Sequence, residues 1–179
     1  MAGIWVYRLV VFISAFLLFQ IQPMTSKVLL PSFGGSYLVW GSCMVFYQGM
    51  LLLGYIYAHL IQRKLGVVRY SRLHWIAILA PFLMLPIGLD RLGADPAHLP
   101  LAVAVFLSLL TSVALPVLAL STTSLIAQRW LSVSDLPERE NPYFLYSASN
   151  LGSMLGLLTY PVLVEPLIGL QVQWYAWWG

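Results

Sequence analysis

Four polar side chains interrupt or border the long apolar stretches of this sequence: Lys27, Gln48, Asn150 and Glu165. A polar group in hydrocarbon is costly without a partner, so such residues often mark a contact between helices or a path for a solute. An amide is satisfied within its own helix less readily than a hydroxyl, which can bond back to a preceding carbonyl. We expect Gln48 and Asn150 to form hydrogen bonds between helices, with contact to a polar substrate as the alternative.

Lys27 and Glu165 each lie beside hydrophobic sequence, on what we expect to be the same side of a membrane. One possibility is an ion pair that closes the first span against the fifth. The alternative is two independent side chains, each with its stem along apolar surface and its charge in water. Only the first arrangement couples the two residues energetically.

The other candidates for chemistry form no catalytic or metal-binding pattern. His59 and His74 would ligate a haem only if their helices abut, and histidines at helix ends near the membrane surface are the simpler interpretation. His98 is expected on the outer side. The sequence has no HExxH, CxxC, CxxCH, GxGxxG, Walker or GxSxG pattern. Cys43 is the single cysteine and has no partner in the chain. We expect no catalytic residue, no metal and no cofactor in these 179 residues.

The composition is typical of a protein in a lipid bilayer. Of its residues, 60% are hydrophobic and 8% are charged, with a mean hydropathy of +0.85, whereas a soluble domain carries about 25% charged residues. The net charge of +3 is small for a nucleic-acid-binding protein, and the apolar runs exclude a disordered chain. We therefore expect the bilayer as its surroundings and no nucleic acid as a partner.

Five apolar stretches approach the roughly 20 residues that a helix needs to cross a bilayer. They are continuously apolar, unlike the alternating strands of membrane barrels, and helices pair their backbone groups internally in lipid. A sixth helix begins at about 171–179. The sequence predicts one all-α integral membrane domain over residues 1–179, a polytopic bundle with spans at about 3–21, 37–61, 73–89, 99–127 and 143–164.

The distribution of Lys and Arg predicts the orientation, because cytoplasmic loops are enriched in both. With a cytoplasmic N-terminus, seven of the nine basic residues lie inside and only Lys27 and Arg91 lie outside. The opposite orientation leaves two inside. We expect a multi-pass protein with its N-terminus in the cytoplasm and the Trp-rich residues 174–178 outside.

Two loops and one helix face have a distinct character. The segment 23–36, with Pro31 and the pair Gly34-Gly35, predicts a bend or a short re-entrant piece. The polar segment 132–142 ends in Asn141-Pro142, which predicts the start of the fifth span. Within that span, small residues recur every four positions and allow close helix packing, either inside the chain or with another subunit; these residues are Ala148, Gly152 and Gly156.

Two long blocks resemble a single bacterial membrane-protein family. In block 22–60 the shared features are Gln22-Pro23-Met24, Lys27, Pro31, Gly34-Gly35-Ser36, Trp40, Phe46, Gln48, Gly54-Tyr55 and Ala58-His59. In block 141–173 they are Pro142-Tyr143, Leu145-Tyr146, Ser149-Asn150-Leu151-Gly152-Ser153, Tyr160-Pro161, Glu165-Pro166 and Gln173. With these features the chain is similar over essentially its whole length to the proteins described as fused major-facilitator/spermidine-synthase-like.

The resemblance implies a module of the bacterial inner membrane that precedes further helices and a cytosolic spermidine-synthase-like domain. Such a domain would bring a Rossmann-like fold for an S-adenosyl nucleotide. This chain has no glycine-rich nucleotide motif and no acidic cluster for a polyamine amine, so aminopropyl transfer is not assigned to it. Either it is part of a longer protein or it is a shortened relative used as a subunit.

Three functions follow. The first is a non-catalytic integral membrane module or subunit that anchors or assembles a larger complex, with lipid and other membrane subunits or further helices of the same protein as its partners. The second is a transporter-like module for a small polar or cationic solute, which would need more helices. The third is the membrane fragment of a polyamine-aminopropyltransferase-like enzyme whose catalytic domain lies elsewhere. The missing catalytic constellation and the small-residue stripe favour the first.

Overall fold

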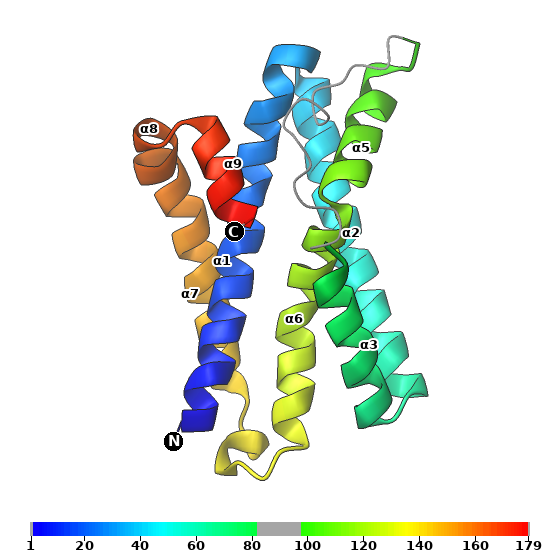
Figure 1. Ribbon diagram of the computed structural model, residues 1–179, viewed down its shortest axis with the longest axis vertical. Coiled ribbons are helices and arrows are strands. Elements are labelled where there is room, and N and C mark those ends of the chain that lie inside the picture. The colour runs from blue at the N-terminus through cyan, green and yellow to red at the C-terminus, as the bar shows by residue number, and fades with distance from the viewer. Residues whose placement is uncertain (1, 82–97, 179) are drawn as a thin grey trace.

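A computed structural model describes residues 2–81 and 98–178, and their regular secondary structure is entirely helical, as the sequence predicts (Figure 1). The α-helices are α1 (Ala2–Phe33), α2 (Tyr37–Lys64), α3 (Val67–Leu79), α5 (Leu101–Ser112), α6 (Ala114–Ser132), α7 (Tyr143–Thr159), α8 (Glu165–Leu167) and α9 (Leu170–Trp178). A 3-10 helix, η2 (Pro137–Glu140), precedes α7, and a π-helix, η3 (Tyr160–Val164), joins α7 to α8.

Two helical stretches are long and apolar enough to cross a membrane, Gly3–Phe33 and Tyr37–Lys64. The pair α5 and α6 makes a third if it is counted as one bent span. The second half of the predicted third span, together with Arg91, lies outside the described residues. The chain is thus a helical protein with two to three candidate membrane spans among its described residues.

The first helix is longer than the sequence predicts. The segment 23–36 was expected to be a loop, but α1 continues through Pro23 to Phe33, and the chain turns only at Gly34, whose φ of 76° suits glycine. The cost of a proline inside the helix is outweighed by packing, because buried side chains continue at helical spacing along one face. These are Ile21, Met24, Thr25, Val28 and Leu29.

The predicted fourth span is divided in two. The helix breaks at Val113, between α5 and α6, with a bend of 67°. Pro116 accounts for the break, because it has no N–H for the carbonyl of Ser112 and its ring crowds the preceding turn. Helix α7 begins at Tyr143, directly after Pro142 and therefore where the sequence predicts a helix start.

The helices run up and down along a common direction (Figure 1). Helix α1 packs against α7 and α6, while α2 packs against α6 and α5. The N-terminus, the turn between α2 and α3, and η2 lie at one end of the bundle, and the turn between α1 and α2 lies at the other (Figure 1). The segments at the first end carry seven of the nine basic residues: Arg8, Arg63, Lys64, Arg69, Arg72, Arg129 and Arg139.

Candidate functional site

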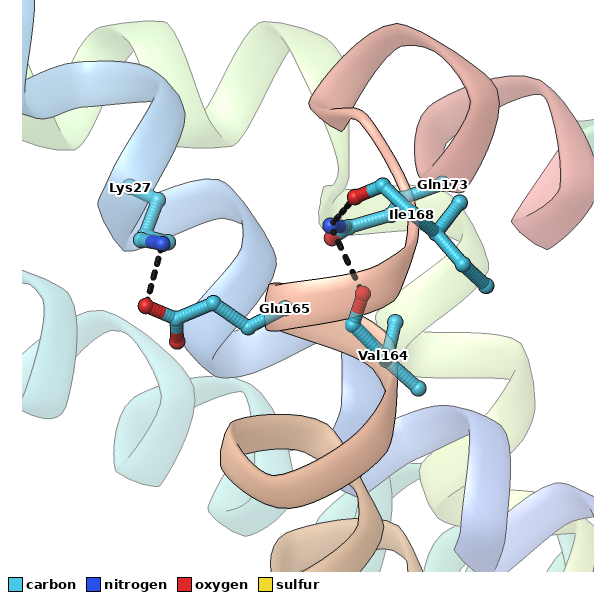
Figure 2. Close-up of polar contacts among 5 residues, drawn as sticks. All are labelled: Lys27, Val164, Glu165, Ile168 and Gln173. Carbon is cyan, nitrogen blue, oxygen red and sulfur yellow. Dashed lines mark hydrogen bonds and ion pairs between the residues drawn. The ribbon is translucent and has the colours of Figure 1, made fainter.

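Lys27 and Glu165 form an ion pair between α1 and the start of α8, with Nζ 2.5 Å from Oε1 (Figure 2). The two side chains are 37% and 38% exposed, so the pair is partly accessible and not sealed in the core. Of the two arrangements considered from the sequence, the structure has the paired one. The contact joins the last two turns of α1 to α8, which lies at the far end of the continuous helical run that starts with α7.

The π-helix η3 directs Glu165 toward α1. The backbone N–H of Glu165 donates to the carbonyl of Tyr160, five residues earlier, instead of four. Pro161 lacks an N–H, which frees a carbonyl of α7 and favours the wider turn. An additional residue in a turn rotates the following side chains by about 100° around the helix axis. The sequence signal for this feature was Tyr160-Pro161 inside an otherwise apolar run.

Gln173 closes the short helix that carries Glu165 (Figure 2). Its Nε2 donates to the carbonyl of Ile168 at 2.6 Å and approaches that of Val164 at 3.4 Å. Helix ends leave carbonyls without intrahelical partners, and the buried Gln173 side chain supplies a donor from the next helix. Gln173 belongs to the resembling blocks, but sequence reasoning gave it no role.

Helix α9 folds back along α1 after Gly169. The indole Nε1 of Trp177 donates to the carbonyl of Leu17 at 3.0 Å, and Trp174 is buried in the main core cluster. Figure 1 shows α9 beside the upper half of α1. Trp174 and Trp177 of α9 therefore pack on other parts of this chain.

The small-residue stripe of α7 faces α1. A Cβ atom on Gly152 would collide with the carbonyl oxygen of Phe12, and one on Gly156 would lie 2.8 Å from that of Phe16. Ala148, one turn earlier, is half-buried. Gly152 and Gly156 therefore serve packing within the chain, the first of the two alternatives for this stripe, and they let the two backbones approach closely.

Gln20 is a site that sequence reasoning missed. Its Nε2 donates to Oγ1 of Thr159 at 2.9 Å and links α1 to α7, and the Gln20 side chain is only 7% exposed. The available signal was an amide within an apolar run, the same signal that singled out Gln48 and Asn150. One sequence does not reveal which of several such amides faces a neighbouring helix.

Gln48 and Asn150 lie on the outside of the bundle. Both side chains are exposed, and neither amide makes a hydrogen bond to another described residue. Each is near the middle of its helix, α2 or α7. Their neighbours one turn away are exposed apolar or aromatic side chains: Met44 and Leu52 beside Gln48, and Tyr146 and Met154 beside Asn150.

The two histidines considered as haem ligands differ in their surroundings. His59 is exposed, whereas His74 is fully buried, with ring centroids of Tyr57 and Trp130 at 6.5 and 5.8 Å. Neither nitrogen of His74 has a hydrogen-bond partner in the described part of the chain. Across the same residues, no group of three or more His, Cys, Asp or Glu side chains is positioned to hold a metal ion.

No protein-family model, curated protein or solved structure matches this chain. Membership of the family that the two sequence blocks resemble is therefore a proposal, and it rests on the residues of those blocks. In the fold, Lys27 from the first block meets Glu165 from the second, and Gln173 closes the helix of Glu165 (Figure 2).

Proposed function

We propose that the chain is a non-catalytic membrane module that assembles with further helices, either other subunits or another part of the same protein, in the bacterial inner membrane. In this proposal it is related to the membrane part of the fused major-facilitator/spermidine-synthase-like proteins. Its partners are lipid and those further helices.

The exposed amides of Gln48 and Asn150 carry the proposal. Each lies amid exposed apolar side chains on a helix that is otherwise suited to lipid. An amide in hydrocarbon loses its hydrogen bonds to water, which costs several kcal/mol in a purely apolar medium. A polar group from an adjacent helix would remove most of that cost, so these two positions favour covered surfaces over lipid-facing ones.

We further propose five spans, the start of a sixth, and a cytoplasmic N-terminus. Helix runs without interruption from Tyr143 through η3 to Leu167, roughly 35 Å at 1.5 Å per residue, which is enough for a span. The gathering of basic residues at the end of the bundle with the N-terminus supports the orientation, since basic residues prefer the cytoplasmic side.

A transporter-like module for a small polar or cationic solute is the second candidate, and the cavity beside Lys27 and Glu165 favours it. Gln48 and Asn150 do not line that cavity, so the four polar residues do not follow one path. An enzyme fragment is the third candidate and depends on a catalytic domain outside these residues. The assembly proposal accounts for both exposed amides and therefore comes first.

The test compares Gln48→Leu and Asn150→Leu with Thr111→Val, which alters an exposed hydroxyl that already bonds to its own helix. The tagged chain is isolated from its native membrane in mild detergent, and its size is measured by native electrophoresis. We expect the two leucine variants to shift to a smaller species and the Thr111 variant to retain the larger one.

Contact of the two amides with lipid predicts a different and equally specific result. If Gln48 and Asn150 face lipid, leucine removes an unfavourable polar group and should stabilise the chain without changing its size. Unchanged assembly together with a raised melting temperature in both variants would refute the assembly proposal.

A further inference from the structure

A cavity of about 560 Å³ lies along α1 between the first half of α2 and the η3 region. Its volume falls within the range of about 300–1,000 Å³ that is typical of small-molecule sites. Polar and apolar residues share its walls. The polar ones include Gln22, Lys27, Tyr160 and Glu165, and the apolar ones include Trp40, Met44 and Leu157.

Tyr160, one of the residues that line this cavity, has a hydroxyl whose hydrogen-bonding capacity is unused. Its side chain is 2% exposed, and its hydroxyl has no hydrogen-bond partner among the described residues. Buried hydroxyls are normally paired, so an unpaired one on a residue that lines a cavity points to a polar partner that a ligand could supply. Gln22 lines the same cavity and offers an amide from α1.

The ion pair also has unused bonding capacity. An ammonium group has three N–H donors and a carboxylate has two oxygens, whereas the Lys27–Glu165 contact uses only one oxygen of Glu165. An anion would bind to the remaining donors of Lys27, and a cation with N–H groups would bind to the second oxygen of Glu165. A ligand with both charges leaves the site neutral, which matters near hydrocarbon because unbalanced charge there is costly.

The position of the cavity favours a ligand from the bilayer. Lys27 lies six residues before the end of α1, about 9 Å along the helix axis, so the pair is near the membrane surface under the proposed topology. Trp40 fits the aromatic belt at this level. Met44 and Leu157 are exposed as well as lining the cavity, so its apolar wall continues onto the outer surface where acyl chains lie.

We propose that this cavity binds a zwitterionic phospholipid with a primary ammonium headgroup, of the phosphatidylethanolamine type. The headgroup phosphate accepts from Lys27, and its ammonium donates to Glu165. The Tyr160 hydroxyl donates to a phosphate or glycerol ester oxygen, and the acyl chains follow Met44 and Leu157. The inference rests on the proposed membrane placement but not on the proposed assembly.

The experiment titrates the purified full chain in detergent with three lipids that have the same acyl chains, and counts bound lipids by native mass spectrometry. The headgroups are ethanolamine, choline and glycerol. Choline lacks N–H donors for Glu165, and the glycerol headgroup leaves a net negative charge. We expect the ethanolamine lipid to bind about tenfold more tightly than the other two, in keeping with a charge-assisted hydrogen bond.

Amino-acid substitutions test whether the preference for the ethanolamine lipid arises from binding in the cavity. Lys27→Met/Glu165→Gln keeps the net charge, and Tyr160→Phe removes only the hydroxyl; both should reduce the preference to less than about twofold. Tyr143→Phe, at an exposed tyrosine of the opposite end, is the matched control and should retain it. The wild-type comparison of the three lipids tests the proposal even if a variant fails to fold.

Three results would overturn the proposal. One is equal binding of the three lipids by the wild-type chain. Another is an unchanged ethanolamine preference in the double variant. The third is displacement of the lipid by soluble phosphoethanolamine at a similar concentration, which would identify a site for a small zwitterion. In each case the assembly measured with the Gln48 and Asn150 variants is unaffected, so the two proposals fail separately.

Discussion

Gln20 of α1 and Thr159 of α7 are joined by a hydrogen bond between side chains, with Nε2 2.9 Å from Oγ1. The Thr159 hydroxyl donates in turn to the carbonyl of Leu155 at 2.6 Å. The two bonds form a short polar chain between two apolar helices that also meet at Gly152 and Gly156. Close backbone packing and one polar link thus occur on the same helix pair.

The Gln20–Thr159 bond predicts unequal effects for its two partners. Thr159→Val leaves the amide of Gln20 buried without its acceptor and should cost about 1.5 kcal/mol of unfolding free energy. Gln20→Met removes the donor, while Thr159 keeps its bond to Leu155, and should cost about 0.5 kcal/mol. Thr111→Val is the control, since Thr111 is exposed and bonds within its own helix. Unfolding in detergent micelles measures all three, and equal losses would contradict the interpretation.

Gly152→Leu should separate α1 from α7. The added side chain meets the backbone of α1 at Phe12, which cannot move aside as a flexible side chain can. We expect a loss of at least about 3 kcal/mol of unfolding free energy, at the upper end of the cost of overpacking. Gly41→Leu is the matched control, because a Cβ there meets nothing within 4 Å. Similar stability of the two variants would rule out the close helix contact.

Lys27 and Glu165 should be coupled, but modestly. Both side chains are more than a third exposed, so water screens the pair and its coupling should be about 0.5–1 kcal/mol. The measurement is a double-mutant cycle in unfolding free energy with Lys27→Met and Glu165→Gln. The double variant should be more stable than the sum of the single losses implies. Strictly additive losses would mean that the ion pair does not form in solution.

The proposed orientation predicts which cysteines an external reagent reaches. With Cys43 replaced first, a cysteine at Ser32 should react in intact cells, because this exposed residue lies near the outer end of α1. A cysteine at Gly66, in the exposed turn between α2 and α3, should react only after the membrane is opened. The reverse labelling pattern would invert the topology.

The sequence by itself determined the helical class and the start of α7 at Tyr143, because continuous apolar runs and the Asn141-Pro142 signal are local properties. It did not determine where α1 ends. The positions of proline and glycine favoured a loop after Pro23, whereas the burial of one helix face as far as Leu29 stabilises the helical conformation. Packing against other helices outweighed the local preference, and packing is not visible in a local pattern.

Only the tertiary structure determines which polar side chains face a neighbouring helix and form contacts with it. Gln20, Gln48 and Asn150 are all amides within apolar helices, yet Gln20 faces α7 and the other two face outward. Lys27 and Glu165 are 138 positions apart in sequence, and the π-helix after Pro161 brings Glu165 toward α1. Hydrophobicity sets which segments are helices, but the rotation of each helix depends on how its neighbours fit, which is a property of the assembled bundle.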